Sequence, residues 1–250
     1  DKALVHRFAG VRAVLAAYCG AQAVPVAVRA QIVALFATHV LAGTGAASPA
    51  VVAAFSESGA FALFTPADMK VDAKIGMAWS TALKRRSTTL VPLLLTRFLA
   101  EIKIDLSDSA VPLFLPALLE YMATKVSGWH ADDPAHAAGS ECASLLMRRI
   151  SDSGTFTEVL AQVKVMIAGE ENASGVVVRK WTQRAGLLSV IESVRLASRE
   201  KGAQFVARLA QDAIETLFLV AGKATNFEVK RMCYVLAGKW LGSLSGSFAE

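Results

Sequence analysis

The sequence is poor in charge, proline and cysteine. Only 19 % of its 250 residues are Asp, Glu, Lys or Arg, whereas 54 % are apolar, and seven are proline. Globular domains typically contain about 25 % charged residues. The composition therefore excludes a disordered chain, and we expect much of the surface to be buried within the chain or against a neighbour. Lys and Arg number 26 against 21 Asp and Glu, a net charge of +5, which permits contact with phosphate without requiring it.

The three cysteines, Cys19, Cys142 and Cys233, lie far apart and form no Cys-x-x-Cys pair. An odd, scattered set argues against a disulfide framework and indicates a reducing compartment. The chain begins Asp-Lys-Ala, without Met and without a secretory or other targeting signal. We therefore expect residues 1–250 to form one continuous segment of a larger cytoplasmic protein.

Apolar runs long enough to cross a membrane are also missing. The longest stretch without a charged residue, 30–56, is rich in alanine and is interrupted by Gly43-Thr-Gly45 and Ser48-Pro49. A membrane span requires about 20 strongly apolar residues. We therefore predict buried helices here and no contact with a membrane.

Helical periodicity is what the sequence has in abundance. From Val229 to Leu244, apolar residues recur at offsets of 0, 3, 4, 7, 8, 11, 12 and 15 residues, which places them on one face of a helix. Trp79, Trp181 and Trp240 lie on such stripes and are expected in the core. No segment shows the period of two that indicates strands. We therefore predict an all-α protein with helices at 2–19, 25–42, 49–63, 66–85, 88–102, 108–126, 134–151, 154–168, 175–197, 201–221 and 226–245.

Polar helix starts recur at a regular interval. Ser107, Ser153 and Ser198 stand 46 and 45 residues apart, and each interval encloses two predicted helices. Thr65-Pro66 and Asp133-Pro134 have the form of a cap followed by proline. Helix pairs with a period of about 40–47 residues are typical of HEAT and armadillo repeats, which must stack to bury their apolar faces. We therefore expect a HEAT-repeat α-solenoid; an irregular globular helical bundle is the alternative.

No motif brings catalytic residue types together. His130 and His136 flank two aspartates, but their spacing matches no common zinc site. Serines that precede glycines lack the strand context of a nucleophile elbow. The glycine-bounded turn 169–175 is acidic and lacks Gly-Lys-Ser/Thr, so it does not fit a phosphate loop. We expect a non-enzymatic protein without metal or cofactor, with a hydrolase of unfamiliar type as an alternative.

Basic residues gather at three places, and each group also fits an ordinary solvated helix face or the negative end of a helix dipole. If stacking aligned the groups along one ridge, they would form a stripe suited to ribosomal RNA or to an acidic protein partner. The candidate binding residues are Lys84, Arg85, Arg86, Arg179, Lys180, Arg184, Lys223 and Lys230.

An ordered series of segments carries a resemblance to a known family. The series begins at 64–69 (Phe-Thr-Pro-Ala-Asp-Met) and runs through the helices and Ile-Asp-Leu-Ser turn of 93–107. It continues through the helix that ends at 151–153 and through 160–169, and it returns at 181–188 and 227–241. These segments resemble the amino-terminal HEAT region of the general-control translational activators, very large ribosome-associated proteins. The turn 169–175 departs from the family's Gly-Ser-Glu-Gly-Lys-Leu because it has no lysine.

The resemblance implies a scaffold. Members of the family activate the kinase that phosphorylates the α subunit of translation initiation factor two, act on stalled or starved ribosomes, and work with an ABC-type ATPase. The kinase-binding segment of these proteins lies towards the carboxyl terminus. The part of the family's function that the resemblance implies for this segment is therefore association with ribosomal RNA and ribosomal proteins. An adaptor of HEAT or armadillo type that binds protein cargo, a phosphatase or a transport partner is the alternative.

Overall fold

The structure, a computed structural model, describes residues 24–41, 55–126, 133–169, 178 and 180–245, together with isolated positions 13 and 17. The side chains of 39–40, 85–90 and 181–182 are outside this description. So are most of the predicted helix 2–19, Cys19, His130 and most of the turn 169–175. All regular elements in the described ranges are helical, which confirms the all-α prediction there. None of these helices combines the length and apolar character needed to cross a membrane.

The elements of the described residues include α-helices, π-helical segments (η1, η4 and η5) and 3₁₀ turns (η2 and η3). In chain order they are α2 (Val26–Leu35), η1 (Phe36–Leu41), η2 (Ala60–Leu63), η3 (Pro66–Met69), α4 (Lys74–Leu90), η4 (Val91–Leu95), α5 (Thr96–Glu101), α6 (Ser107–Ser109), η5 (Ala110–Phe114), α7 (Leu115–Thr124), α8 (Pro134–Arg148), α9 (Ser153–Ala168), α10 (Trp181–Lys201), α11 (Ala203–Lys223) and α12 (Phe227–Ser245).

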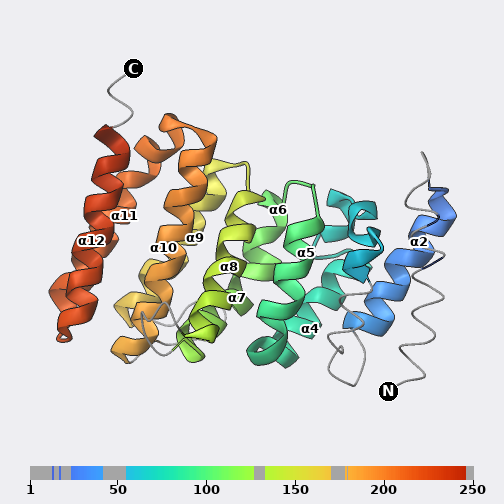
Figure 1. Cartoon of the computed structure of the whole chain (residues 1–250), viewed down its shortest axis with the longest axis horizontal. Coiled ribbons are helices and arrows are strands. Elements are labelled where there is room, and N and C mark those ends of the chain that lie inside the picture. Colours follow the sequence, from blue (N-terminus) through green and yellow to red (C-terminus); the bar gives the residue numbers. More distant parts are fainter. Residues whose placement is uncertain are drawn as a thin grey trace.

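The helices form an elongated stack of two layers, which runs from α2 at one end to α12 at the other (Figure 1). In one layer α4 packs on α7, η5 on α9, and α9 on α11; in the other, α5 packs on α8, α8 on α10, and α10 on α12. The most extensive contact joins α11 to α12. Substantial contacts link only elements of the same helix pair or of adjacent pairs among the described residues.

Aromatic contacts, many of them edge-to-face, fill the core of the amino-terminal half. The ring of Phe36 lies 5.3 Å from those of Phe55, Phe61 and Phe64, and the Trp79 ring lies 5.0 Å from that of Phe98. Such pairs add about 0.5–1.5 kcal/mol each beyond the burial of their area. Trp79 is fully buried, as predicted.

The stripe predicted for the last helix is confirmed over most of its length. Its side chains are buried from Val229 to Trp240, whereas Leu241 is 53 % exposed and Leu244 is only partly buried. The predicted stripe is therefore wrong at Leu241, which lies two turns after the exposed Tyr234 and so on the same outer side of α12. Cys233 lies on this stripe, and it and Cys142 are buried free thiols.

Ser198 does not begin a helix, contrary to the prediction. It is fully buried inside α10, and its hydroxyl donates to the backbone oxygen of Arg195 at 2.8 Å. The chain turns instead at Gly202, whose φ of 119° is one that residues with a side chain rarely adopt, and α11 begins at Ala203. The helix pairs therefore begin at Ser107, Ser153 and Ala203, at intervals of 46 and 50 residues.

The predicted boundaries of the earlier helices also need correction. Thr65-Pro66 starts only the short η3, and the chain bends before α4 begins at Lys74. Gly59, with φ of 71°, interrupts the helix predicted at 49–63. The helical backbone runs from α4 through η4 into α5 without the break predicted at 86–87.

Candidate binding surface

Hydrogen bonds join the turn before α6 to the turn before α9. The amide of Leu106 donates to the backbone oxygen of Arg149 at 2.7 Å, and the amides of Ser151 and Asp152 donate to the hydroxyl oxygen of Ser107 at 3.0 and 3.1 Å. We call this set of contacts the turn latch. It fixes the spacing of two successive helix pairs.

The carboxylate of Asp105 lies at the centre of the turn latch. It accepts from the amide of Ser107 at 2.8 Å and from the hydroxyls of Ser107 and Ser151. Partial burial raises the pKa of Asp105, but these hydrogen bonds lower it by more, so the pKa lies below its usual value. The charged form is thus the one that the turn stabilises.

The same edge of the stack is joined again at the next turn. Arg148 forms an ion pair with Glu200 at 2.9 Å, and Lys201 donates to the backbone oxygen of Arg148 at 3.4 Å. From α11, Arg208 donates to the hydroxyl oxygen of Ser153, the first residue of α9, at 2.8 Å. Polar contacts therefore run from one turn to the next along this edge.

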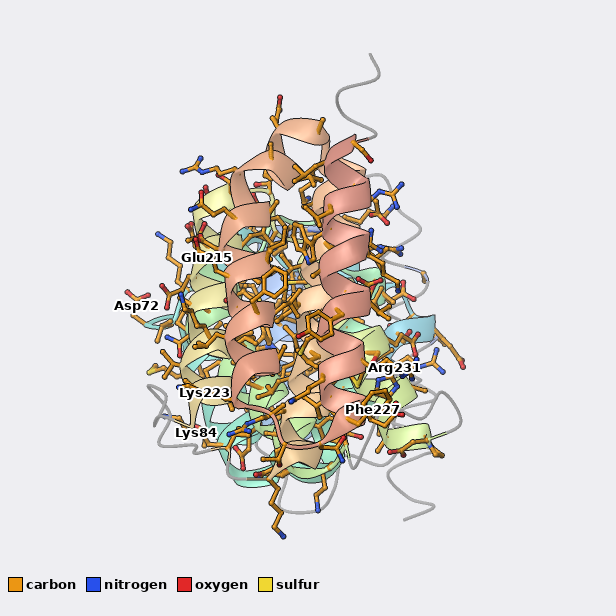
Figure 2. The ribbon with its side chains drawn as sticks, turned by 90° about the vertical axis from the view of Figure 1, so that its left-hand side faces the viewer. Asp72, Lys84, Glu215, Lys223, Phe227 and Arg231 are labelled. Carbon is orange, nitrogen blue, oxygen red and sulfur yellow. The ribbon has the colours of Figure 1, made fainter. Side chains whose placement is uncertain are left out.

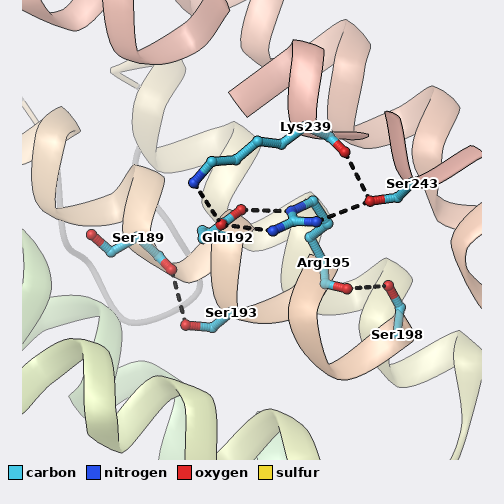
Figure 3. Close-up of polar contacts among 7 residues, drawn as sticks. All are labelled: Ser189, Glu192, Ser193, Arg195, Ser198, Lys239 and Ser243. Atoms are coloured by element: carbon cyan, nitrogen blue, oxygen red, sulfur yellow. Dashed lines mark hydrogen bonds and ion pairs between the residues drawn. The ribbon is translucent and has the colours of Figure 1, made fainter. Parts of the chain in front are cut away.

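A partly buried ion network ties α10 to α12 in the other layer (Figure 3). Both Nε and Nη2 of Arg195 donate to the carboxylate of Glu192 at 2.8 Å, and Nη1 donates to the hydroxyl oxygen of Ser243 at 2.9 Å. Lys239 completes the network with a bond of 3.0 Å to Glu192. Burial raises the pKa of Glu192, but the hydrogen bonds from Arg195 and Lys239 and their positive charges lower it by more, and the pKa is below its usual value.

A groove of about 710 Å³ opens between α4, η5, α7 and α9. Lys84 and Glu120 line it, and neither side chain forms an ion pair within the described residues. Ser80 and Gln162 add neutral polar groups. The remaining lining is apolar and comprises Val71, Leu83, Val111, Pro112, Leu113, Leu115, Pro116, Ala117 and Leu119. The groove thus offers apolar surface with one cation and one anion, a combination that suits a peptide with apolar side chains.

Of the basic residues predicted to bind a partner, the structure brings Lys84 and Lys223 to one side of the stack. Both are exposed, one on α4 and the other in the last turn of α11. The view along the stack in Figure 2 shows them on the same side, with Asp72 and Glu215 above them and Arg231 on the opposite side. This side therefore carries charges of both signs.

The other predicted binding residues have diverse settings. Lys180 is exposed at the start of α10, and Lys230 is half-buried on α12. Arg184 is half-buried, and its Nε has no hydrogen-bond partner within the described residues. Arg179 and the side chains of Arg85 and Arg86 lie outside the described residues.

Sequence reasoning did not identify the groove or the ion network. The spacing of Glu192 and Arg195, three residues apart on an apolar helix, was a usable signal for the network, because such residues face the same side. No three side chains of His, Cys, Asp or Glu gather at metal-binding distance in the part of the chain that the structure describes. Nε2 of His136 lies 2.9 Å from the hydroxyl of Ser189, a contact that joins α8 to α10.

Comparison of the chain with family models, with curated proteins and with solved structures finds no match. The resemblance to the translational activators therefore remains a prediction from the sequence.

Proposed function

We propose that the chain is a non-catalytic, HEAT-type scaffold segment that associates with ribosomes in the cytoplasm. In this proposal it belongs to an activator of the initiation-factor-two-α kinase in the starvation response. The kinase and an ABC-type ATPase bind elsewhere on that activator.

The helix stack supports the HEAT part of this proposal. Among the described residues, each pair contacts only its neighbours to a substantial extent, and successive pairs meet at joined turns such as the turn latch. Stacked helix pairs with nearest-neighbour contacts are the architecture of α-solenoids, which present long surfaces to large partners.

The observation that carries the ribosome part is the position of Lys84 and Lys223. They come from α4 and α11, helices separated along the stack by α7 and α9, and both are exposed on one side of it (Figure 2). Cations spaced along one side can contact separated phosphates of ribosomal RNA. Each contact is weak and sensitive to salt, and together they add affinity.

Co-sedimentation with ribosomes at about 50 mM and about 200 mM salt tests this proposal. The double variant Lys84→Glu/Lys223→Glu should sediment several-fold less at low salt and show a shallower salt dependence, because two phosphate contacts are lost. The matched control is Arg231→Glu, which reverses a charge on the opposite side and should sediment like the wild type. Equal sedimentation of the double variant and the wild type would reject this surface, provided that circular dichroism shows both folded.

The groove favours a second candidate function, that of an adaptor for protein ligands. Its lining combines an apolar surface with Lys84 for an acidic side chain of the ligand. Ser80→Phe places a ring in the groove while preserving every charge. In pull-downs followed by peptide identification, this variant should lose the captured peptides yet still sediment with ribosomes. Loss of ribosome binding in Ser80→Phe, with peptide capture intact, would favour the groove as part of the ribosome surface instead.

A further inference from the structure

The groove between α4, η5, α7 and α9 lies within the stack and not at its end. Along the stack, α2 lies on one side of these elements, and α11 and α12 lie on the other (Figure 1). A partner stacked on α12 would therefore not cover the groove. Its volume of about 710 Å³ is in the range of ligand pockets.

The apolar lining of the groove includes both buried and exposed side chains. Leu83, Leu113 and Leu119 are among the buried ones. Val71 and Pro112 are exposed. Removal of apolar surface from water is the main favourable term in most protein association. A ligand therefore gains affinity by placing apolar side chains in the groove.

The two charged lining residues have opposite signs and come from different helices. Lys84 on α4 is exposed and Glu120 on α7 is half-buried, and neither forms an ion pair within the described residues. Each is the last lining residue of its helix. The hydroxyl of Ser109 donates to the backbone oxygen of Met69 at 2.8 Å, which joins the starts of the two segments. The cation and the anion therefore lie towards the same end of the groove, one on each wall.

The wall formed by η5 carries a backbone oxygen that lacks its helical donors. The amide of Leu115 donates to the backbone oxygen of Ala110, and Pro116 has no N–H. The oxygen of Val111 thus receives neither of the bonds that residues four and five positions later supply in a helix. Val111, Leu115 and Pro116 all line the groove. A ligand that displaces water from this oxygen must supply a donor. An extended peptide has free N–H groups for this purpose, whereas most amides of a helix are engaged within it.

We propose that the groove binds an extended segment of a partner protein in which an acidic and a basic residue are adjacent and stand next to apolar residues. Successive side chains of an extended chain point to opposite sides. Adjacent charges of opposite sign therefore reach Lys84 on one wall and Glu120 on the other. A nucleic acid offers no cation for Glu120. From Val111 to Glu120 the wall is about 13 Å long, the length of about four extended residues.

This inference rests on the second candidate function, the adaptor for protein ligands, and names the class of its ligand. The ribosome proposal uses Lys84 as well, but it uses neither Glu120 nor the apolar lining. The two proposals can therefore fail separately.

Peptides selected from a random display library on the immobilised full chain, and then titrated in solution by fluorescence anisotropy, test the inference. We expect the enriched peptides to contain adjacent acidic and basic residues beside two or more apolar ones. Ser80→Phe, which places a ring in the groove, should abolish their binding. The matched control is Arg231→Glu on the opposite side of the stack (Figure 2), which should bind them like the wild type.

Exchange of the two charges tests the pairing directly. Lys84→Glu and Glu120→Lys should each bind the enriched peptides several-fold more weakly, because each places like charges together. The double variant Lys84→Glu/Glu120→Lys should regain affinity for peptides whose acidic and basic residues are exchanged, a rescue that damage to the fold cannot produce. N-methylation of the peptide amides one at a time should identify one position that weakens binding several-fold, because it removes the donor to Val111.

The outcomes separate the ligand class from the adaptor function. Peptides that Ser80→Phe no longer binds, but whose affinity neither charge variant changes, would overturn the inference and leave the adaptor function standing. Failure to enrich any peptide, or full binding of the enriched peptides to Ser80→Phe, would reject both.

Discussion

Arg195 on α10 and Ser243 on α12 are 48 residues apart in sequence and are joined by a hydrogen bond of 2.9 Å. The same guanidinium holds Glu192 through two bonds, and only 7 % of the Arg195 side chain is exposed. One buried cation therefore satisfies a carboxylate of its own helix and a hydroxyl of the neighbouring helix. This arrangement leads to the first prediction.

Replacing Arg195 by alanine should lower the free energy of unfolding by about 3 kcal/mol, because it leaves a partly buried carboxylate with Lys239 as its remaining cation. Urea denaturation of the purified variant measures this change. Arg231→Ala is the control, since Arg231 forms an exposed pair with Glu228 at 3.0 Å. Such pairs contribute under about 1 kcal/mol. A loss in Arg195→Ala no larger than that in Arg231→Ala would show that the network stabilises the fold no more than an exposed pair does.

Acid should weaken the fold through Glu192 and Asp105. Both carboxyls have pKa values below their usual 4.5 and 3.8, so their contribution is fully present above those values and is lost as the pH falls through the lowered ones. We expect the melting temperature to be steady near neutral pH and to fall below about pH 4.5. The variant Glu192→Gln should have a lower melting temperature than the wild type at pH 7, and its melting temperature should fall less between pH 5 and pH 3. A parallel decline in both proteins would contradict this assignment.

Gly186 marks a close approach between α10 and the end of α7. A methyl group at this position would lie 2.1 Å from the backbone oxygen of Met122, so one of the helices must shift to accept it. We expect Gly186→Ala to cost about 3 kcal/mol, measured by chemical denaturation at low protein concentration. Gly242→Ala is the control. Its added methyl group meets nothing within 4 Å, so it should stabilise the helix by about 0.5–1 kcal/mol.

Removing the Asp105 carboxylate should loosen the turn latch locally. In Asp105→Ala, the amide of Ser107 loses its acceptor and the hydroxyls of Ser107 and Ser151 lose a partner. Hydrogen exchange followed by mass spectrometry should show faster exchange in peptides covering 105–110 and 150–155, with little change in α12. Asp108→Ala, at an exposed position in the same turn, is the control. Faster exchange over the entire chain would show that this turn stabilises the whole fold and not one junction.

Local patterns predicted the helices well where one face of a helix carries the core. The stripe from Val229 to Trp240 and the start of α8 at Asp133-Pro134 follow from spacing and capping alone; Asp133 accepts from the amide of Ala135 at 2.9 Å. Ser198 misled the prediction because a serine can satisfy its hydroxyl within its own helix, as it does here with Arg195.

Tertiary packing decided the features that the sequence could not reveal. The cap at Thr65 is real, since its amide donates to Asp68 at 2.8 Å, but Arg29 of α2 also binds that carboxylate. The chain then turns so tightly that a side chain on Gly76 would meet the backbone oxygen of Lys70. The groove depends on the packing of α4 against η5 and α7. No local pattern specifies such packing.

The shared side of Lys84 and Lys223 has the same origin. Both lysines stood out in the sequence by charge alone. Their relative position depends on how many helices lie between them and on how each helix is rotated. The burial of the intervening helices determines that rotation. Clusters of basic residues in the sequence therefore identify candidate binding residues, but only the three-dimensional structure shows whether these residues lie on one side of the stack.

The joined turns have a mechanical consequence. They connect the amino-terminal ends of α6, α9 and α11 along one edge of the stack, and so they restrain the length of that edge. Any change in curvature must then open or close the spacing at the other ends of these helices. A partner that bends the stack would thus separate the helix pairs at the edge opposite the joined turns, while the edge with the joined turns keeps its length.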